Sequence, residues 1–287
     1  MSSADMAAFW RKLAYVGSRY GPRVWLELSP APIGLSISVA APRARRNVER
    51  RLRDVLAPIE PGALRLASTR AFMQYAHCLA ESLASGRPEA ARARCRFKER
   101  GQETALRSGR GLVVVTAHAG AWDAAANLLA RDFDKPVTIV MRPEPSAGAR
   151  AVHDAVRSQR GVEVVYVGRN PTDALPLLSR LREGGIVAFQ IDRMPPGTRG
   201  LDVEMFGCGG RLPEGPFRIA ALAQVPVQPL FVRRVGHFDY ELWGGPALSL
   251  PRRASREQLR VVAAQAAWEL ERFLRAHPTQ WFCFDAD

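Results

Sequence analysis

A histidine and an aspartate five residues apart are the side chains of this sequence best placed for acid–base chemistry. His118 directly follows the apolar run 112–117, and the small residues 119–121 let the chain turn tightly into a helix that contains Asp123. The helix dipole favours a carboxylate in the first turn, where it can accept the proton of a nearby imidazole ring. That contact fixes the tautomer of the histidine and stabilises the imidazolium. We therefore predict that His118 is a general base and Asp123 its partner.

Other interpretations use the same residues. The spacing alone is a weak signal, because five histidines and 28 acidic residues make chance matches frequent. His118 could be a histidine satisfied at a strand end, with Asp123 as a helix cap. The pair could also bind a metal ion with a third ligand such as His153 or Asp192, but no dense ligand cluster supports this, and we expect no metal site. A G-x-S-x-G elbow and a G-x-x-x-x-G-K-[ST] loop do not occur, which disfavours serine hydrolase and P-loop chemistry.

Five short apolar runs separated by helical stretches predict an α/β fold with a mainly parallel central sheet flanked by helices. The runs are mostly uninterrupted, which is typical of strands buried on both faces. One connecting helix is expected from about 172 to 183, between Pro171 and Gly184. In such a sheet ligands bind beyond the carboxyl ends of the strands, and His118 lies at one of these ends. The expected strands are 112–116, 137–141, 162–167, 186–190 and 227–232.

The chain before the sheet is expected to be helical. We predict one domain over residues 1–287, with a helical annex at 1–105 and an α/β catalytic core at 106–287. Residues 6–39 mix aromatic and apolar side chains with arginines and prolines, which indicates short amphipathic helices. These helices either lie in the headgroup region of a bilayer or form a cap packed on the domain, and the sequence leaves both open.

The charge of the chain favours anionic partners. The 41 Lys and Arg residues exceed the 28 Asp and Glu residues, which gives a formal net charge of +13. Nucleic acid, an acidic membrane face and an acidic carrier protein all fit this field, and arginine-rich genomic composition would produce the same excess. The basic run 87–100 is either a docking strip for an acidic partner or a solvated surface.

The cysteines and the hydropathy of the chain indicate the kind of cellular compartment that we expect. The four cysteines lie far apart without a C-x-x-C pair, so we expect no disulfide framework, no zinc site and a reducing environment. No stretch approaches the roughly 18 uninterrupted apolar residues of a membrane span, and the amino terminus lacks the pattern of a secretory leader. We therefore expect a protein without a transmembrane span.

The block around His118 is similar to a family motif, and further blocks follow in the same order. Residues 118–123 (HAGAWD) resemble the His-x4-Asp/Glu motif of the lysophospholipid acyltransferase superfamily, especially the bacterial lipid A biosynthesis acyltransferase family. The resemblance spans roughly residues 40–285, and ordered blocks are more specific than one motif. The other blocks are 141–143 (MRP), 190–193 (QIDR), 205–207 (MFG), 213–215 (PEG) and 278–281 (PTQW).

The resemblance implies acyl transfer from an acyl carrier protein or acyl-CoA thioester to a hydroxyl or amine of a lipid or glycolipid acceptor. His118 would act as the base, without a covalent enzyme intermediate and without a cofactor beyond the acyl-ACP or acyl-CoA co-substrate. Arg142 would bind an acceptor phosphate, since a guanidinium forms paired hydrogen bonds with it. Asp192 would orient Arg142, bind acceptor hydroxyls or serve as a structural cap. Backbone amides near Gly207 and Gly215 would bind an oxyanion or phosphate, or these glycines are only turn residues.

Partners and location follow from the same resemblance. It implies a peripheral protein on the cytoplasmic face of the inner membrane that meets a carrier protein or acyl-CoA, an anionic membrane surface and a lipid acceptor, and no nucleic acid. The chain differs from the lipid A branch in having Asp123 where Glu is common, in lacking a leading membrane span and in lacking Gln after Asp192. The acceptor is therefore left open. The alternatives are an inactive basic module that binds membranes or nucleic acid, and an acyltransferase for a small-molecule or polyketide acceptor.

Overall fold

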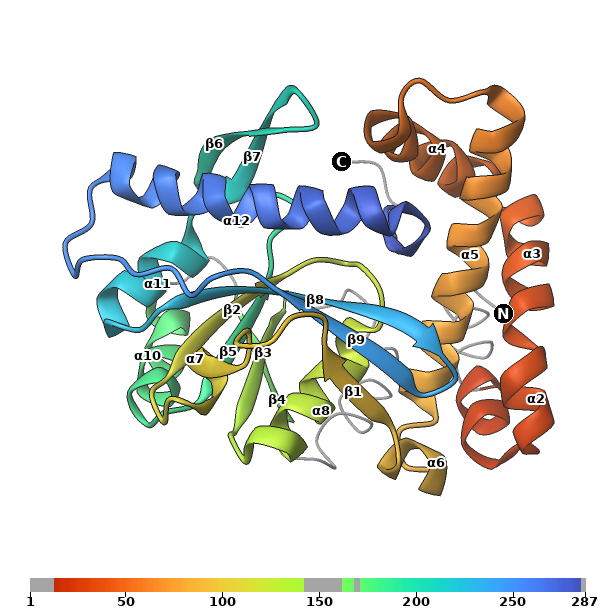
Figure 1. Ribbon diagram of the computed structural model, residues 1–287, viewed down its shortest axis with the longest axis horizontal. Helices are drawn as coiled ribbons and strands as arrows, with labels where there is room; N and C mark the ends of the chain where they lie inside the picture. The colour runs from red at the N-terminus through yellow and green to blue at the C-terminus, as the bar shows by residue number, and fades with distance from the viewer. Residues whose placement is uncertain (1–12, 142–161, 168–170, 285–287) are drawn as a thin grey trace.

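A seven-stranded sheet forms the centre of the protein in the computed structural model (Figure 1). The structure describes residues 13–141, 162–167 and 171–284. The strand order is β1-β9-β8-β2-β5-β3-β4, and every neighbouring pair is parallel except β8 and β9. The predicted α/β fold with a mainly parallel sheet is thereby confirmed. The strands are β1 Arg94–Phe97, β2 Leu112–Thr116, β3 Val137–Met141, β4 Val162–Tyr166, β5 Ile186–Gln190, β8 Val227–Gly236 and β9 Asp239–Gly244.

All five predicted strands are present. β2, β3 and β5 have the predicted bounds, β4 ends one residue earlier, and β8 continues to Gly236. The apolar runs do not predict β1 or β9. β1, with the sequence RCRF, is an edge strand that alternates exposed and half-buried residues, so it has no continuous apolar run. It lies in the range predicted as the helical annex, yet it pairs with β9 of the sheet.

The two faces of β2 pack against different helices. Val113 and Val115 belong to the apolar cluster that includes α10, α11 and α12, whereas Leu112 and Val114 belong to the cluster that includes α8. This division follows from the two-residue period of a strand. The predicted connecting helix is present as α10, preceded by a 3-10 turn at 171–174. These helices are α8 Trp122–Phe133, α10 Leu175–Arg182, α11 Gly215–Ala223 and α12 Arg256–Ala276.

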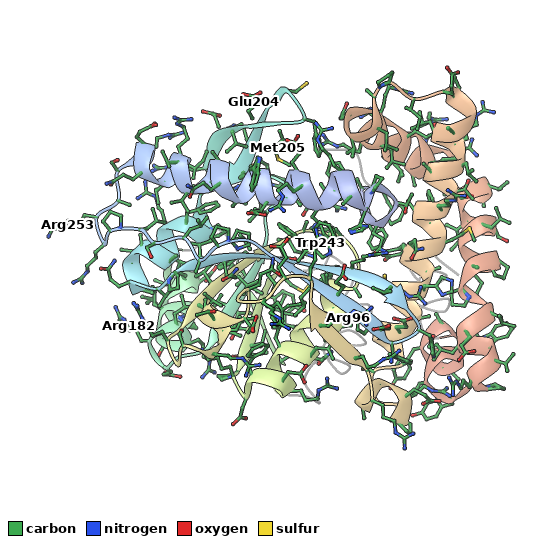
Figure 2. All side chains as sticks on the ribbon, in the orientation of Figure 1. Arg96, Arg182, Glu204, Met205, Trp243 and Arg253 are labelled. Atoms are coloured by element: carbon green, nitrogen blue, oxygen red, sulfur yellow. The ribbon has the colours of Figure 1, made fainter. Side chains whose placement is uncertain are left out.

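A two-stranded hairpin, β6 Gly200–Met205 and β7 Cys208–Pro213, covers the outer side of α12. Figure 2 shows Glu204 and Met205 on this hairpin and Trp243 of β9 on the sheet side of α12. The ring of Trp243 meets that of Phe273 of α12 edge-on, with the ring centroids 5.7 Å apart. α12 therefore lies between the sheet and the hairpin.

The annex packs at one end of the molecule, beside the β8–β9 hairpin (Figure 1). All but the first of its five helices below begin with proline, whose fixed φ suits the first helical position and which has no N–H to leave unsatisfied. Gly34 allows α3 to approach α5 closely, because a Cβ at this position would lie 2.6 Å from the Cα of Met73. The helices are α2 Arg23–Leu28, α3 Pro30–Ala40, α4 Pro42–Leu56, α5 Pro61–Leu83 and α6 Pro88–Ala91.

Membrane-spanning potential is limited in these helices. Across the described ranges, no helix by itself has the length and apolar character needed to cross a bilayer. The stretch Arg23–Ala40 passes the test only together with α4, and the two are bent by 99° from each other.

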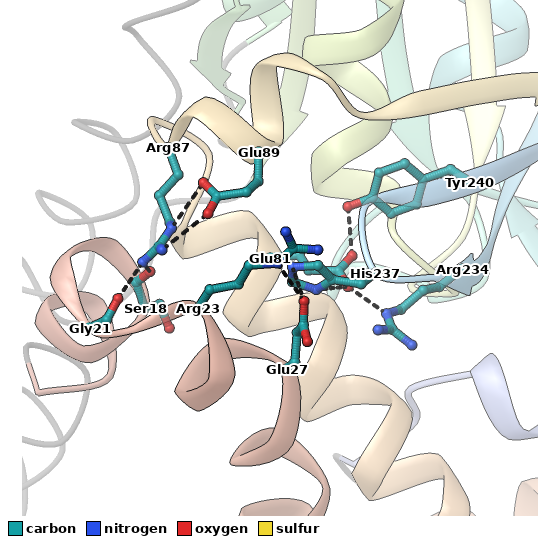
Figure 3. Close-up of polar contacts among 10 residues, drawn as sticks. All are labelled: Ser18, Gly21, Arg23, Glu27, Glu81, Arg87, Glu89, Arg234, His237 and Tyr240. Atoms are coloured by element: carbon teal, nitrogen blue, oxygen red, sulfur yellow. Dashed lines mark hydrogen bonds and ion pairs between the residues drawn. The ribbon is translucent and has the colours of Figure 1, made fainter.

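A buried carboxylate on α5 joins the annex to the β8–β9 hairpin (Figure 3). Glu81 accepts a hydrogen bond from the Tyr240 hydroxyl at 2.6 Å and another from Arg234 Nε at 2.8 Å. The side chains of Glu81 and Arg234 are 2% and 11% exposed. His237 of the hairpin lies between two carboxylates, with Nδ1 3.7 Å from Glu81 and Nε2 3.8 Å from Glu27 of α2. The cluster therefore ties α2 and α5 to the sheet.

We expect Glu81→Ala to lower the free energy of unfolding by about 3–5 kcal/mol, because it leaves the Arg234 guanidinium buried without an anion. Tyr240→Phe removes one hydrogen bond to that anion and should cost about 1–3 kcal/mol. The measurement is urea unfolding followed by tryptophan fluorescence. Glu183→Ala, at an exposed carboxylate after α10, is the control. A Glu81→Ala cost no larger than that of the control would contradict the structural role of the cluster.

Candidate active site

A tight turn after β2 places His118 at the carboxyl end of the sheet. Gly120 in this turn has φ +57°, and a Cβ there would lie 1.6 Å from the carbonyl oxygen of Val232, so the position requires glycine. The segment after α12 closes on the turn from the other side. The Phe282 amide donates to the His118 carbonyl at 2.9 Å, and the Gly120 amide donates to the Gln280 carbonyl at 2.8 Å. The backbone that carries His118 is therefore held by β8 and by the carboxy-terminal segment.

Asp192 is the carboxylate that orients the histidine ring. Its Oδ1 lies 2.9 Å from His118 Nδ1 and accepts the His118 backbone amide at 3.0 Å, and its Oδ2 accepts Trp281 Nε1 at 3.1 Å. The strand register explains this meeting: Thr116 of β2 pairs with Gln190 of β5, so residues 118 and 192 both lie two positions beyond that pair. An ionised carboxylate only accepts, so Nδ1 carries the proton and Nε2 is the basic nitrogen.

The charge of Asp192 is maintained by its contacts. Burial by itself would raise the pKa of this carboxyl, but the facing His118 and the hydrogen bonds from His118 and Trp281 outweigh it and lower the pKa to about 2. The Asp192 side chain is 1% exposed, whereas that of His118 is 30% exposed. The site thus presents an accessible imidazole backed by a buried anion.

Asp123 lies in the first turn of α8, as predicted, and is half-buried. The Nδ1 contact that the motif assigns to it is made by Asp192 instead, because the parallel pairing of β2 and β5 brings the more distant carboxylate into line. Trp122, the neighbour of Asp123, places its ring edge-on to the His118 ring, with centroids 6.3 Å apart. The role of Asp123 as a catalytic residue stays a prediction.

The other predicted site residues are Arg142, Asp192, Gly207 and Gly215, and the three that the structure describes do not form one cluster. Arg142 and its expected contact with Asp192 lie outside the described residues. Asp192 faces the histidine and the indole. Its role in binding an acceptor stays a prediction. Gly207, with φ +74°, follows Phe206 at the tip of the β6–β7 hairpin, and Gly215 begins α11 beyond the hairpin base. Six-residue strands separate the two glycines by roughly 20 Å, so their amides do not converge on one oxyanion.

The carboxy-terminal block contains site residues whose roles the sequence does not reveal. Gln280 is buried and exchanges two hydrogen bonds with the Arg234 backbone, accepting from its amide at 2.9 Å and donating to its carbonyl at 2.8 Å. Trp281 holds Asp192, and its ring contacts Phe206 of the hairpin with centroids 6.0 Å apart. The sequence marks this block only through family resemblance, because its partners are distant along the chain.

Clusters of metal-binding side chains can be assessed only for the described residues. Within residues 13–141, 162–167 and 171–284 there is no group of three or more His, Cys, Asp and Glu side chains that could hold an ion. His153, considered above as a third ligand, lies outside these ranges.

Comparison with known proteins gives the family. Residues 71–286 match the family model described as bacterial lipid A biosynthesis acyltransferase. A phosphatidylinositol mannoside acyltransferase of Mycobacterium tuberculosis is 26% identical over 183 residues, which cover 62% of this chain and 55% of that protein. The protein of the same description from Mycolicibacterium smegmatis is 29% identical over 143 residues, covering 49% and 45%. The chain thus spans about half the length of these curated relatives. Since the family model covers most of its length, the chain belongs to the bacterial lipid A biosynthesis acyltransferase family.

Proposed function

We propose that the protein transfers a fatty acyl group from a thioester, borne by an acyl carrier protein or coenzyme A, to a hydroxyl or amine of a lipid or glycolipid acceptor. The observation that carries the proposal is the His118–Asp192 pair at the carboxyl end of β2. Family membership and the acyltransferase activity named for the relatives support the acyl transfer. No cofactor is invoked beyond the thioester itself.

The chemistry begins with proton transfer to His118. Nε2 takes the proton from the acceptor hydroxyl or amine as the oxygen or nitrogen attacks the thioester carbonyl. The tetrahedral oxyanion then collapses, the carbon–sulfur bond breaks, and the imidazolium returns the proton to the departing sulfur. Asp192 stabilises the imidazolium between these two transfers, because it is a buried anion 2.9 Å from Nδ1.

Other residues complete the proposal. Asp123, at the positive end of α8, is the second proposed catalytic group. Arg142 is proposed to bind a phosphate of the acceptor, and a backbone amide near Gly207 or Gly215 is proposed to face the oxyanion. Asp192 serves as a positioning residue in this scheme.

We expect His118→Ala to abolish acyl-dependent thiol release and Asp192→Asn to lower kcat by about 100- to 10,000-fold, with KM changed much less. The asparagine keeps the size of the side chain but removes the anion that stabilises the imidazolium. Thiol release from acyl carrier protein and acyl-CoA substrates, with and without a lipid extract, is the measurement.

Asp202→Asn is the matched control, because Asp202 is an exposed carboxylate on β6 that pairs with Arg211. It should retain wild-type kcat. Equal thiol release by His118→Ala and the wild type would exclude His118 as the base. Release that occurs only with small-molecule acceptors would retain the acyl transfer and overturn the lipid acceptor.

The annex supports a peripheral position on an anionic membrane, which we place at the cytoplasmic face of the inner membrane. Trp25, Leu28 and Val39 are 54%, 67% and 67% exposed, and a group of exposed apolar side chains is typical of a protein or membrane interaction site. Rings and aliphatic side chains enter the headgroup boundary while neighbouring arginines meet lipid phosphates. The large apolar residues exposed between residues 13 and 40 are Leu13, Val16, Tyr20, Val24, Trp25, Leu28, Ile33, Leu35, Ile37 and Val39.

We expect Trp25→Ser combined with Leu28→Ser to weaken binding to vesicles that contain anionic lipid by about tenfold or more, because two large side chains no longer insert. Co-sedimentation with vesicles of phosphatidylglycerol and phosphatidylethanolamine measures this. Trp268→Ser on α12, where the tryptophan is 58% exposed, is the control and should bind normally. Unchanged vesicle binding by the double variant would show that α2 does not contact the membrane.

A further inference from the structure

The outer face of α4 carries four arginines in a line. Arg43, Arg46, Arg50 and Arg53 follow one another at spacings of three, four and three residues, which places them on one side of the helix. All four are exposed, whereas Val48, Leu52 and Val55 on the other side are buried. The line extends over about 15 Å at the rise of an α-helix. We call these four residues the α4 ridge.

The charges of the α4 ridge are not neutralised within the part of the chain that the structure describes. No acidic side chain there lies within ion-pair distance of any of the four arginines; Glu49 of the same helix pairs with Arg45 at 3.6 Å. α4 as a whole holds six arginines against two acidic residues. Four cations at close spacing repel one another, and an anionic partner relieves that repulsion.

The basic run 87–100 provides a contrast. Arg87 donates to the Gly21 carbonyl at 2.7 Å and pairs with Glu89 at 3.3 Å, and Arg94 and Arg96 both pair with Asp239. These arginines bind the annex and the sheet edge. Three arginines of the run that the sequence marks as a docking strip thus have ion pairs within the chain, whereas the four arginines of the α4 ridge have none in the part of the chain that the structure describes.

Helix α4, which carries the ridge, is joined to the segment that closes the candidate active site. Asn47 of α4 donates to the Phe284 carbonyl at 3.0 Å, in the segment that also holds Trp281 and Phe282. Arg275 of α12 donates to the Val55 carbonyl at 3.4 Å, and its guanidinium lies 5.4 Å from the ring centroid of Phe206. The helix that carries the ridge is thus joined by hydrogen bonds to α12 and to the segment that contains Trp281.

We propose that the α4 ridge docks an acidic acyl carrier protein and aligns its thioester arm with His118. The inference rests on the proposed function and selects the protein-borne donor. A helical line of cations matches an acidic helix of a partner better than a bilayer, because no large apolar side chain of α4 is exposed to insert beside the arginines. The apolar membrane surface lies instead on α2 and α3, and α4 is bent away from them by 99°.

The test compares two donors that carry the same acyl group: an acyl carrier protein and the corresponding acyl-pantetheine, which lacks the protein. Charge reversal at Arg46→Glu and Arg50→Glu should lower kcat/KM for the protein donor by tenfold or more and reduce its salt dependence. With acyl-pantetheine, kcat/KM should stay within twofold of the wild type. Arg252→Glu with Arg253→Glu, at two exposed arginines before α12, is the control and should leave both donors unaffected.

Direct binding of the unacylated holo carrier protein, measured by titration calorimetry, tests the surface apart from catalysis. If the α4 double variant loses binding and the control keeps it, the α4 ridge is the docking surface for the carrier protein. If the same proteins show no acyl transfer, the proposed function is wrong but the docking inference stands. Wild-type kcat/KM for the protein donor in the α4 double variant overturns the inference, as does an equal loss for both donors. A loss confined to anionic vesicle binding also overturns it and assigns the arginines to the membrane.

Discussion

The buried carboxylate of Asp192 is the constraint around which the carboxyl end of the sheet is arranged. Its side chain is removed from water and keeps its charge only because donors surround it. Two of these donors belong to His118, 74 residues earlier in the chain, and one to Trp281, 89 residues later. Three distant parts of the polypeptide must therefore meet within hydrogen-bonding distance. The adjacency of β2 and β5 and the position of α12 all serve this meeting.

The extent to which the sequence predicts this arrangement depends on how local each feature is. β2, β3 and β5 are predicted with correct bounds because each is an apolar run with polar or small neighbours, whereas the half-exposed edge strand β1 has no such run. His118 is predicted as a site residue because it lies just beyond the end of β2. Predicting its contact with Asp192 requires the order and register of the strands. A motif defined by residue spacing identifies only the nearby carboxylate, Asp123. The contact between Trp281 and Asp192 cannot be predicted for the same reason, because the two residues are far apart along the chain.

The annex separates two kinds of surface that are mixed in the sequence. Apolar side chains are exposed on α2 and α3, the four arginines of the α4 ridge lie on α4, and a 99° bend between the two parts directs the two surfaces differently. Composition reports only an excess of positive charge, which many anionic partners would satisfy. The fold divides that charge into arginines used internally, as at Arg87, and arginines left to solvent.

The segment that follows α12 closes the turn that bears His118, and this has a consequence for the order of events during synthesis. β2 and its turn emerge from the ribosome long before Gln280, Trp281 and Phe282 are synthesised. Gln280 and Phe282 bind that turn, and Trp281 binds the Asp192 carboxylate. A nascent chain that contains every strand of the sheet still lacks the donors that fix the histidine. The turn that bears His118 is therefore completed only after the segment beyond α12 has emerged and docked.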